Sequence, residues 1–271
     1  MNSPPSLRKP LFREGSVFRA TIRNLVLLLL VLTVWYASVH LFDIPAFVLP
    51  GPDQVANRIA SEYQYILRNL GSTLLAGLSG FLLANALSFA IVSIIHYRPS
   101  AEAAILPYLI SAKAMPVVAV APLIILWFGF GITSKMIMSA LICFFPLVVN
   151  LLEGFRRVDP NLLDLFRTLG ASKTETLVHL KAPASLPFLF SALKISAPMA
   201  IVGAIVAELS GTQSGIGYVI VIASNGFDTA LVFAAVMAAA AMGILLYNFI
   251  RLCEQLVTKR SEQESWEAPE V

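Results

Sequence analysis

The sequence contains few charged residues, cysteines and histidines, and each shortage excludes a class of function. Charged residues make up only 13% of the 271 positions, well below the roughly 25% of soluble domains. The two cysteines, Cys143 and Cys253, offer neither a disulfide framework nor the spacing of a metal site. The three histidines, His40, His96 and His179, form no H-E-x-x-H pair and no spacing that supports a Ser-His-Asp triad. We therefore expect no metal site and no enzyme in this chain.

The sequence also lacks the features of a protein that binds nucleic acid or hydrolyses ATP. The net charge is only +3, and phosphate neutralisation needs Lys and Arg clustered on a folded face. A G-x-x-x-x-G-K-[ST] phosphate-binding loop is absent. The nearest stretch, at 170–174, has no glycine before Lys173 and follows a predicted helix rather than a strand. We expect no nucleic-acid partner and no cofactor bound by the chain itself.

Apolar residues dominate the sequence instead. Hydrophobic residues reach 58% and the mean hydropathy is +0.79, which indicates an integral membrane protein. A helix needs about 20 mainly apolar residues to cross roughly 30 Å of hydrocarbon. Five stretches qualify directly: 24–42, 70–95, 133–151, 188–210 and 228–250. The first follows a long basic arm without an A-x-A cleavage site, so we interpret it as an uncleaved span rather than a signal peptide.

A sixth apolar stretch, 101–130, is too long for one straight span. It contains Pro107, Pro116 and Pro122, and each proline removes a backbone donor and can kink a helix. We assign it as one broken or bent span. The sequence thus predicts an all-α membrane protein with six transmembrane helices within 24–250.

The distribution of basic residues predicts the orientation. An even number of spans places both termini on one side, and cytosolic segments are enriched in Lys and Arg. The N-terminal arm (1–23), the loop between spans 4 and 5, the tail (251–271) and Arg98 together hold fourteen of the 19 basic residues. The segments assigned to the opposite side hold only Arg58, Arg68 and Lys135. We expect both termini to be cytosolic.

The loop between spans 4 and 5 has the pattern of two short helices. Asp159 followed by Pro160 is typical of a helix start, because Asp accepts orphan N–H bonds and Pro fits the first turn. Leu162, Leu165, Phe166 and Leu169 follow at i, i+3, i+4 and i+7, which predicts one apolar stripe. Gly170 is expected to end this helix, since glycine adopts positive φ readily.

A second helix is predicted to begin at Ser172, which forms an S-x-x-E capping box with Glu175. Its apolar positions are Leu177, Val178 and Leu180, and Pro183 is expected to close it. Two readings stay open for the pair of helices. They are either a connector that packs on its own bundle or a surface on which another protein docks.

At these residues the chain resembles the membrane subunits of ATP-binding-cassette (ABC) importers that depend on a binding protein. Their cytosolic signature is E-A-A, three residues, G, about nine residues, then I-x-L-P. Asp164 stands at the Glu position, Leu165 and Phe166 at the Ala positions and Gly170 at the Gly, and 180–183 lies near the closing segment. Pro187 falls in the L-P that often follows. The chain is most similar to the nitrate, sulfonate and taurine branch in the following segments: 49–52, 121–123, 127–131, 134–135, 207–209 and 215–218.

The resemblance implies a type I ABC importer permease fold with cytosolic coupling helices at 159–187, in a bacterial plasma (inner) membrane. It implies contact with a cytosolic ATPase subunit through these residues: Asp164, Leu165, Phe166, Leu169, Gly170, Ala171, Ser172, Pro183 and Pro187. The implied partners are two copies of that ATPase subunit, which use ATP and Mg, a second copy of this permease and an external solute-binding protein. Leu165 and Phe166 depart from the family's alanines, so the fit in the partner's groove is expected to differ.

Ionisable residues inside the spans are expensive in lipid and usually face protein, water or a partner. Lys113 lies deep, beside the break expected at Pro116, and could attract an anionic solute. With Met115, Pro116 and Glu208 it makes up the expected translocation path. The alternative is that Lys113 pairs with backbone carbonyls or with Glu208. Lys194 is expected to snorkel to the inner surface.

Gly215, Gly217 and Tyr218 lie in a glycine-rich stretch after Glu208, followed by a short apolar segment at 219–223. This segment is too short to cross a membrane. It either dips partway in and forms an outer gate, which the resemblance supports, or it is a plain surface loop.

Small residues recur at every fourth position in two spans, which allows close helix approach in lipid. The two sets are Ala76, Gly80 and Ala84, and Ala235, Ala239 and Gly243. They serve either packing within one bundle or contact with a second membrane subunit.

A function as an importer subunit explains the helical loop, because the loop would then bind the ATPase subunit. A self-sufficient secondary transporter or channel would explain the six spans but not that loop. The resemblance narrows the solute to small polar or anionic molecules such as nitrate, sulfonates or taurine. The segment 197–204 also resembles relatives that carry pyrimidine vitamin precursors, so the solute stays open.

Overall fold

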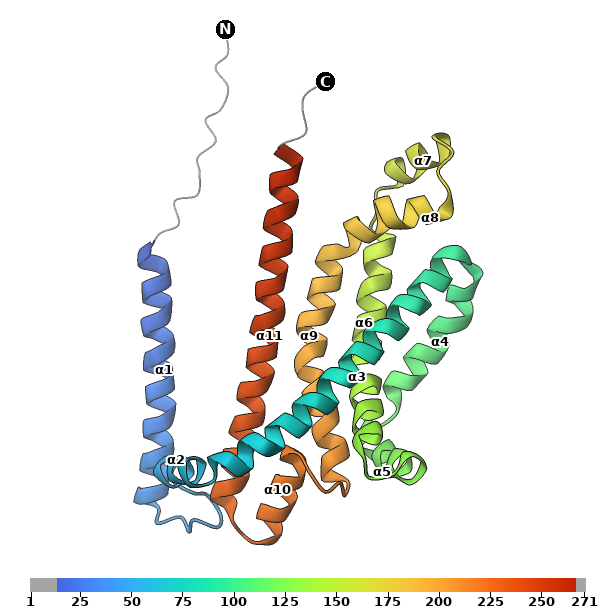
Figure 1. The fold of residues 1–271 in the computed structure, drawn as a ribbon. Helices are drawn as coiled ribbons and strands as arrows, with labels where there is room; N and C mark the ends of the chain where they lie inside the picture. The colour runs from blue at the N-terminus through green and yellow to red at the C-terminus, as the bar shows by residue number, and fades with distance from the viewer. Residues whose placement is uncertain (1–13, 267–271) are drawn as a thin grey trace.

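The computed structural model describes residues 14–266, and this part of the chain is entirely helical apart from its turns. Figure 1 shows long helices that run roughly side by side, a further long helix (63–97) that crosses them obliquely, and short helices at both ends of the bundle. The helices are α1 (Glu14–Leu41), α2 (Pro52–Ser61), α3 (Tyr63–Tyr97), α4 (Ser100–Ala114), α5 (Val117–Phe128), α6 (Ile132–Arg156), α7 (Pro160–Thr168), α8 (Lys173–Glu175), η1 (Thr176–Lys181), α9 (Ala182–Leu209), α10 (Ile216–Asn225) and α11 (Thr229–Trp266). Residues 1–13 of the predicted arm (1–23) and residues 267–271 of the predicted tail (251–271) lie outside the described residues.

Within residues 14–266, five helices are long and apolar enough to cross a membrane, and each covers one of the five spans predicted directly to within one residue. The sixth predicted span is broken, as expected: α4 ends at Ala114 and α5 begins at Val117. Pro116 caps α5 with an extended backbone, φ −69° and ψ 100°. Neither half is long enough to count as a span by itself, so the number six stays a prediction.

The centre of the bundle is formed by α3, α6 and α9, which contact one another extensively. Small residues allow this close approach. A Cβ on Gly80 would lie 2.5 Å from the carbonyl oxygen of Met136, and one on Gly203 would lie 2.6 Å from Cα of Ser139. Ala76 and Ala84 are fully buried. The first set of small residues therefore packs within the bundle, which confirms that reading for α3.

The second set of small residues, on α11, divides between two environments. Ala235 is fully buried and belongs to a core cluster with residues of α10. Ala239 and Gly243 instead line an apolar surface groove between α9 and α11, together with Pro198. Contact between this face and a second membrane subunit stays a prediction.

Helix α1 stands apart from the bundle (Figure 1). Of its described side chains only Val39 is buried. Trp35 joins α1 to the rest of the chain, because its Nε1 donates to the carbonyl of Pro50 at 3.1 Å and its ring packs 5.7 Å from that of Phe233.

The prediction that Pro183 closes the second loop helix is wrong. The chain stays helical from α8 through η1 into α9, and Pro183 lies in the first turn of α9. The turn before it is a π-helix, in which the N–H of Ala182 bonds to the carbonyl of Leu177. In a regular α-helix the proline ring would clash with the carbonyl four residues earlier, whereas the wider π turn accommodates it.

Candidate functional site

The α7–α8 loop, defined as residues 157–175, protrudes at the end of the bundle that also carries the C-terminal end of α11 (Figure 1). Helix α7 begins as predicted. The carboxylate of Asp159 accepts a hydrogen bond from the N–H of Asn161 at 2.8 Å, and Pro160 occupies the first turn. This cap satisfies one of the N–H groups that a helix leaves unpaired at its start.

Gly170 ends α7 in the predicted left-handed conformation, with φ +73°. The N–H of Ala171 bonds to the carbonyl of Phe166, and the N–H of Gly170 bonds to that of Arg167, both at 3.0 Å. This is the Schellman pattern, which pairs the last carbonyls of a helix and turns the chain sharply.

The second helix begins with the predicted capping box. The Ser172 hydroxyl accepts from the N–H of Glu175 at 3.2 Å, and the Glu175 carboxylate accepts from the N–H of Ser172 at 2.7 Å. Both ends of the corner at Gly170 are therefore fixed by local hydrogen bonds, so the loop is a defined helical corner.

The apolar stripe of α7 lies on the surface. Leu162, Leu165 and Leu169 are 44%, 50% and 73% exposed, and α7 has no buried residue. Phe166, the fourth residue of the stripe, is half-buried. Most of the stripe is therefore not covered by the chain's own bundle, and contact with a partner stays a prediction.

The start of α8 is also bound to the last turn of α3, a contact that the sequence did not reveal. Lys173 Nζ donates to the carbonyl of Tyr97 at 3.0 Å, and the carbonyl of Lys173 accepts from His96 Nε2 at 2.9 Å. The hydroxyls of Tyr97 and Thr174 share a hydrogen bond of 3.0 Å. The residues lie 76 or 77 positions apart, and no local motif signals such a pairing.

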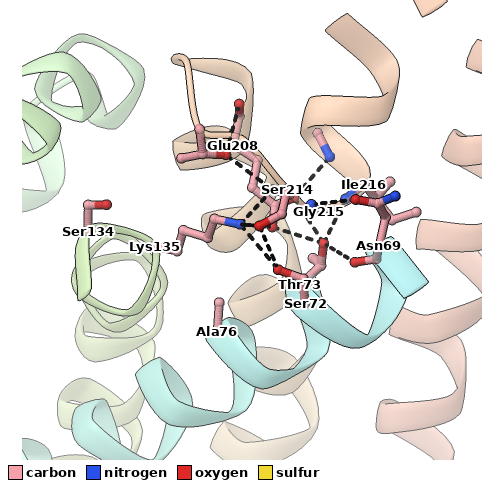
Figure 2. A network of polar contacts seen from close by, with 12 residues as sticks. Asn69, Ser72, Thr73, Ala76, Ser134, Lys135, Glu208, Ser214, Gly215 and Ile216 are labelled. Atoms are coloured by element: carbon pink, nitrogen blue, oxygen red, sulfur yellow. Dashed lines mark hydrogen bonds and ion pairs between the residues drawn. The ribbon is translucent and has the colours of Figure 1, made fainter. Parts of the chain in front are cut away.

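At the opposite end of the bundle, the predicted path residue Glu208 is 1% exposed. Figure 2 shows it within a network of polar side chains from α3, α6 and the segment before α10. Lys135 Nζ lies 3.1 Å from Glu208 Oε1, with side chains that are 3% and 0% exposed. The Thr73 hydroxyl lies 3.0 and 2.9 Å from the two carboxylate oxygens. Lys135, which the charge distribution assigned to the outer side, therefore has its side chain turned into the bundle toward Glu208, and the side of the membrane on which it lies stays a prediction.

The first N–H groups of α10 are bound by side chains from other helices. The N–H of Gly215 donates to Asn69 Oδ1, that of Ile216 to Thr73 Oγ1 and that of Gly217 to Glu208 Oε2, at 2.8, 2.8 and 2.9 Å. These groups have no partner inside the helix. Two helices, α3 and α9, thus supply the cap of a third, and the positive end of α10 faces the Glu208 carboxylate.

The segment before α10 is held by Lys135 as well. Its ammonium group donates to the carbonyl of Ser214 at 2.5 Å and lies 3.2 Å from the Ser214 hydroxyl. The Ser72 hydroxyl shares a hydrogen bond of 3.1 Å with that same hydroxyl. Asn69, Ser72, Lys135 and Ser214 are site residues that the sequence analysis missed as a group, since they meet only through the register of three helices.

The predicted gate glycines are needed for close packing. Gly215 has φ +104°, and a Cβ there would collide with the Glu208 carboxylate. A Cβ on Gly217 would lie 2.7 Å from the carbonyl oxygen of Ile205. Tyr218, the third gate residue, is half-buried on α10. Helix α10 is only 10 residues long and buries Val219 against α11, so it cannot span a membrane.

The other predicted path residues lie elsewhere. The backbone of Lys113 is in the last turn of α4, but its side chain lies outside the described part of the chain. Met115 and Pro116 form the exposed break between α4 and α5. Among the described side chains, Glu208 is paired with Lys135, and no hydrogen bond joins it to Met115 or Pro116.

Lys194 forms an ion pair with Glu254 of α11, with 2.8 Å between Nζ and Oε2. Its side chain is 22% exposed. The expectation that Lys194 snorkels to the inner surface named no partner, and the one found here lies 60 residues further along the chain. The contact joins α9 to α11.

Residues 86–259 match the family of binding-protein-dependent transport system inner membrane components. The chain is 37% identical to the riboflavin transport system permease protein RibX of Chloroflexus aurantiacus over 90% of its own length and 89% of the relative's. It is 32% identical to the putative aliphatic sulfonates transport permease protein SsuC of Bacillus subtilis, over 88% and 87%.

A third relative is the formylaminopyrimidine transport permease protein ThiX of Halalkalibacterium halodurans. The chain is 31% identical to it over 84% of its own length and 92% of the relative's. Both solute branches considered from the sequence, sulfonates and pyrimidines, are thus represented among the relatives. The matched region includes the α7–α8 loop, Lys135, Glu208 and α10. The chain belongs to the binding-protein-dependent transport system inner membrane component family, and it is an ABC transport permease, as the resemblance in its loop predicted.

Proposed function

We propose that this chain is the membrane-spanning subunit of an ATP-driven importer. In this proposal it forms the translocation path, together with a second copy of itself, for a small solute delivered by an external solute-binding protein. Both termini and the α7–α8 loop lie in the cytosol, so α10 lies toward the outside. The observation that carries the proposal is the α7–α8 loop, a capped helical corner whose apolar stripe is exposed.

The loop provides what a docking site requires. The capping box at Ser172 and the Schellman turn at Gly170 fix its shape before any partner binds, which reduces the entropy cost of association. Leu165 and Leu169 offer apolar area to a groove. The partner is a cytosolic ATPase subunit, of which two copies bind ATP and Mg. Contact extends over Asp164, Phe166 and Ala171, and over Pro183 and Pro187, which lie at the start of α9.

The path through the membrane is proposed to run past the break between α4 and α5, where Lys113, Met115 and Pro116 lie. Glu208 belongs to the same proposal in a different role. Its carboxylate is saturated by protein groups, so we assign it to the positioning of α10 rather than to contact with the solute. Helix α10, with Gly215, Gly217 and Tyr218, is then the outer gate.

The solute class is proposed as a small polar or anionic molecule of the nitrate, sulfonate or taurine type. The relatives also support a second candidate, because they include proteins named for riboflavin and formylaminopyrimidine transport. Mass spectrometry of ligands that co-purify with the cognate solute-binding protein distinguishes the two. A sulfonate supports the first candidate, and a heteroaromatic compound supports the second.

Co-purification tests the docking role of the loop. A tagged wild-type chain is expected to retain the ATPase subunit, whereas Gly170→Trp or deletion of 164–181 is expected to lose it. The deletion removes most of the α7–α8 loop, and Gly170→Trp alone introduces strain at a positive φ. A matched control is Thr229→Val, a partly buried threonine at the other end of the bundle whose hydroxyl donates to the carbonyl of Phe47. Full retention by both loop variants would refute the docking role.

A further inference from the structure

We propose that α3 is a rod that transmits movement of the α7–α8 loop to α10, at the opposite end of the bundle. The proposal rests on the proposed function, because an ATPase subunit must move the loop before anything is transmitted. It assigns Tyr97 and Lys173 at one end, and Asn69, Ser72 and Thr73 at the other, as positioning residues of the transport cycle. The proposal rests on one structural relationship. The last turn of α3 forms hydrogen bonds with the α7–α8 loop, and residues near the beginning of α3 form hydrogen bonds with the start of α10.

At the loop end, the attachment uses polar groups of both partners. Lys173 Nζ donates to the carbonyl of Tyr97, one of the last four carbonyls of α3, which have no partner inside the helix. The bonds from Tyr97 to Thr174 and from His96 to the carbonyl of Lys173 add a side-chain and a backbone contact. A displacement of the first turn of α8 therefore acts on α3 directly, without passing along the chain.

At the α10 end, the attachment is buried. Asn69 and Thr73 accept the N–H groups of Gly215 and Ile216, and they are 6% and 0% exposed. Thr73 also donates to Glu208, which in turn accepts the N–H of Gly217. Figure 2 shows these side chains converging on the start of α10. Breaking any of these bonds leaves a buried polar group unpaired, which is costly, so α10 must follow α3.

The helix between the two attachments is uninterrupted. Tyr97 lies 24 positions after Thr73, which is a rise of about 36 Å at 1.5 Å per residue. Helix α3 contains no proline, whereas α6 contains Pro146 and α9 contains Pro187 and Pro198 within their lengths. Prolines remove a backbone hydrogen bond and permit bending. Of the three central helices, α3 is the one best suited to carry force along its axis.

The covalent route from the loop to α10 is less direct. It passes from α8 through the π turn of η1 and then along α9, past both prolines. A π turn has irregular hydrogen bonding. The hydroxyl of Ser139 lies 3.2 Å from the carbonyl of Gly77 and 2.9 Å from that of Ala200. This contact, one turn from Thr73, holds α3 in register with α6 and α9 close to the place where α3 binds α10.

The experiment measures solute uptake per ATP hydrolysed in liposomes that contain the full complex of permease, ATPase subunit and binding protein. The loop-end variant is Tyr97→Phe with Lys173→Met, and the α10-end variant is Thr73→Val. We expect each to lower uptake per ATP by about fivefold or more, the lower range of typical coupling energies, while the ATPase subunit still co-purifies. The variant that combines the changes at both ends is expected to lower uptake per ATP only as far as the single variant with the larger loss does, because both changes break the same series of contacts.

Two outcomes would contradict the proposal that α3 transmits movement of the loop to α10. One is an unchanged ratio in both variants. The other is a combined loss equal to the product of the single losses, since sites this far apart act additively when they are independent. Should Thr73→Val fail to fold, the same comparison uses Ser72→Ala, which removes one exposed hydroxyl bonded to Ser214. Failure of the proposed function looks different: the wild-type chain then shows no ATP-dependent uptake at all.

Matched controls separate transmission from general damage. Tyr63→Phe is the control for Tyr97→Phe, because it removes a tyrosine hydroxyl from the first turn of the same helix. Arg98→Met is the control for Lys173→Met, because it removes an exposed positive charge directly after the last turn of α3. Both are expected to keep the wild-type ratio. Thr73→Ser retains the hydroxyl and is expected to restore the ratio lost in Thr73→Val. A loss in Thr73→Ser as large as that in Thr73→Val would indicate packing damage and contradict the role of the hydroxyl.

Discussion

Lys135 and Glu208 lie 73 residues apart in the sequence and form an ion pair of 3.1 Å that is almost completely buried. The pair joins α6 to α9, and its hydrogen bonds extend to α3 and to the start of α10. A charge buried without a partner is strongly unfavourable. The pair therefore fixes the relative positions of four helices at one end of the bundle.

Removal of the lysine should destabilise the protein. Lys135→Met leaves the Glu208 carboxylate without its cation, and we expect a loss of about 3–5 kcal/mol in the free energy of unfolding. Denaturation of the purified permease in detergent measures this loss. The double variant with Glu208→Gln should recover a large part of it, because the amide oxygen still accepts the N–H of Gly217.

Arg68→Met is the matched control for that experiment, because Arg68 is an exposed cation on α3. It should change the free energy of unfolding by about 0.5 kcal/mol or less. A Lys135→Met variant as stable as Arg68→Met would show that the ion pair does not hold the helices together.

Two glycines with positive φ should respond differently to alanine. At Gly170, with φ +73°, nothing lies within 4 Å of an added Cβ, so Gly170→Ala should cost only the conformational strain, about 1–2 kcal/mol. At Gly215, with φ +104°, the Cβ would also collide with the Glu208 carboxylate. Gly215→Ala should therefore destabilise the permease more than Gly170→Ala in thermal unfolding. Equal losses would mean that α10 does not approach Glu208 this closely.

The caps of the α7–α8 loop should act locally. Asp159→Ala and Ser172→Ala each remove a side-chain cap, worth about 1 kcal/mol. Since α7 has no buried residue, we expect faster hydrogen exchange of the amides in 160–168 and 173–176, with little change in global unfolding. Thr258→Ala, on the exposed part of α11, is a control that should leave these amides unchanged. Protection that stays at the wild-type level would contradict the role of the caps.

The ion pair between Lys194 and Glu254 should contribute less than the buried pair. Its side chains are 22% and 25% exposed, which places it between a fully exposed pair, worth about 0–1 kcal/mol, and the buried pair of Lys135 and Glu208. Glu254→Gln should therefore lower the unfolding midpoint only slightly, and the difference should shrink at high salt. A loss as large as that of Lys135→Met would show that α11 depends on this contact.

Local features of the fold were predictable from the sequence because they depend on neighbouring residues. The cap at Asp159, the end of α7 at Gly170 and the capping box of Ser172 with Glu175 each arise within a few positions. The break before Pro116 is of the same kind. These features rest on backbone geometry, which sequence patterns describe well.

Contacts between distant helices were not predictable. The pairing of Lys135 with Glu208, and of Tyr97 with the start of α8, depends on the rotation and register of whole helices. Nothing local in the sequence sets these values. The prediction that Pro183 ends a helix was wrong for a related reason, because no local sequence motif marks the π turn that accommodates this proline.

ATP-dependent uptake of solute by reconstituted liposomes tests the central claim that the α7–α8 loop binds this permease to a separate ATPase subunit. The wild-type complex should import solute only with the ATPase subunit, binding protein and internal ATP present. Leu165→Asp with Leu169→Asp should abolish uptake and association with the ATPase subunit, because two charges then occupy the apolar stripe, and the permease should still fold. Solute uptake by the permease alone, driven by an ion gradient, would contradict the account.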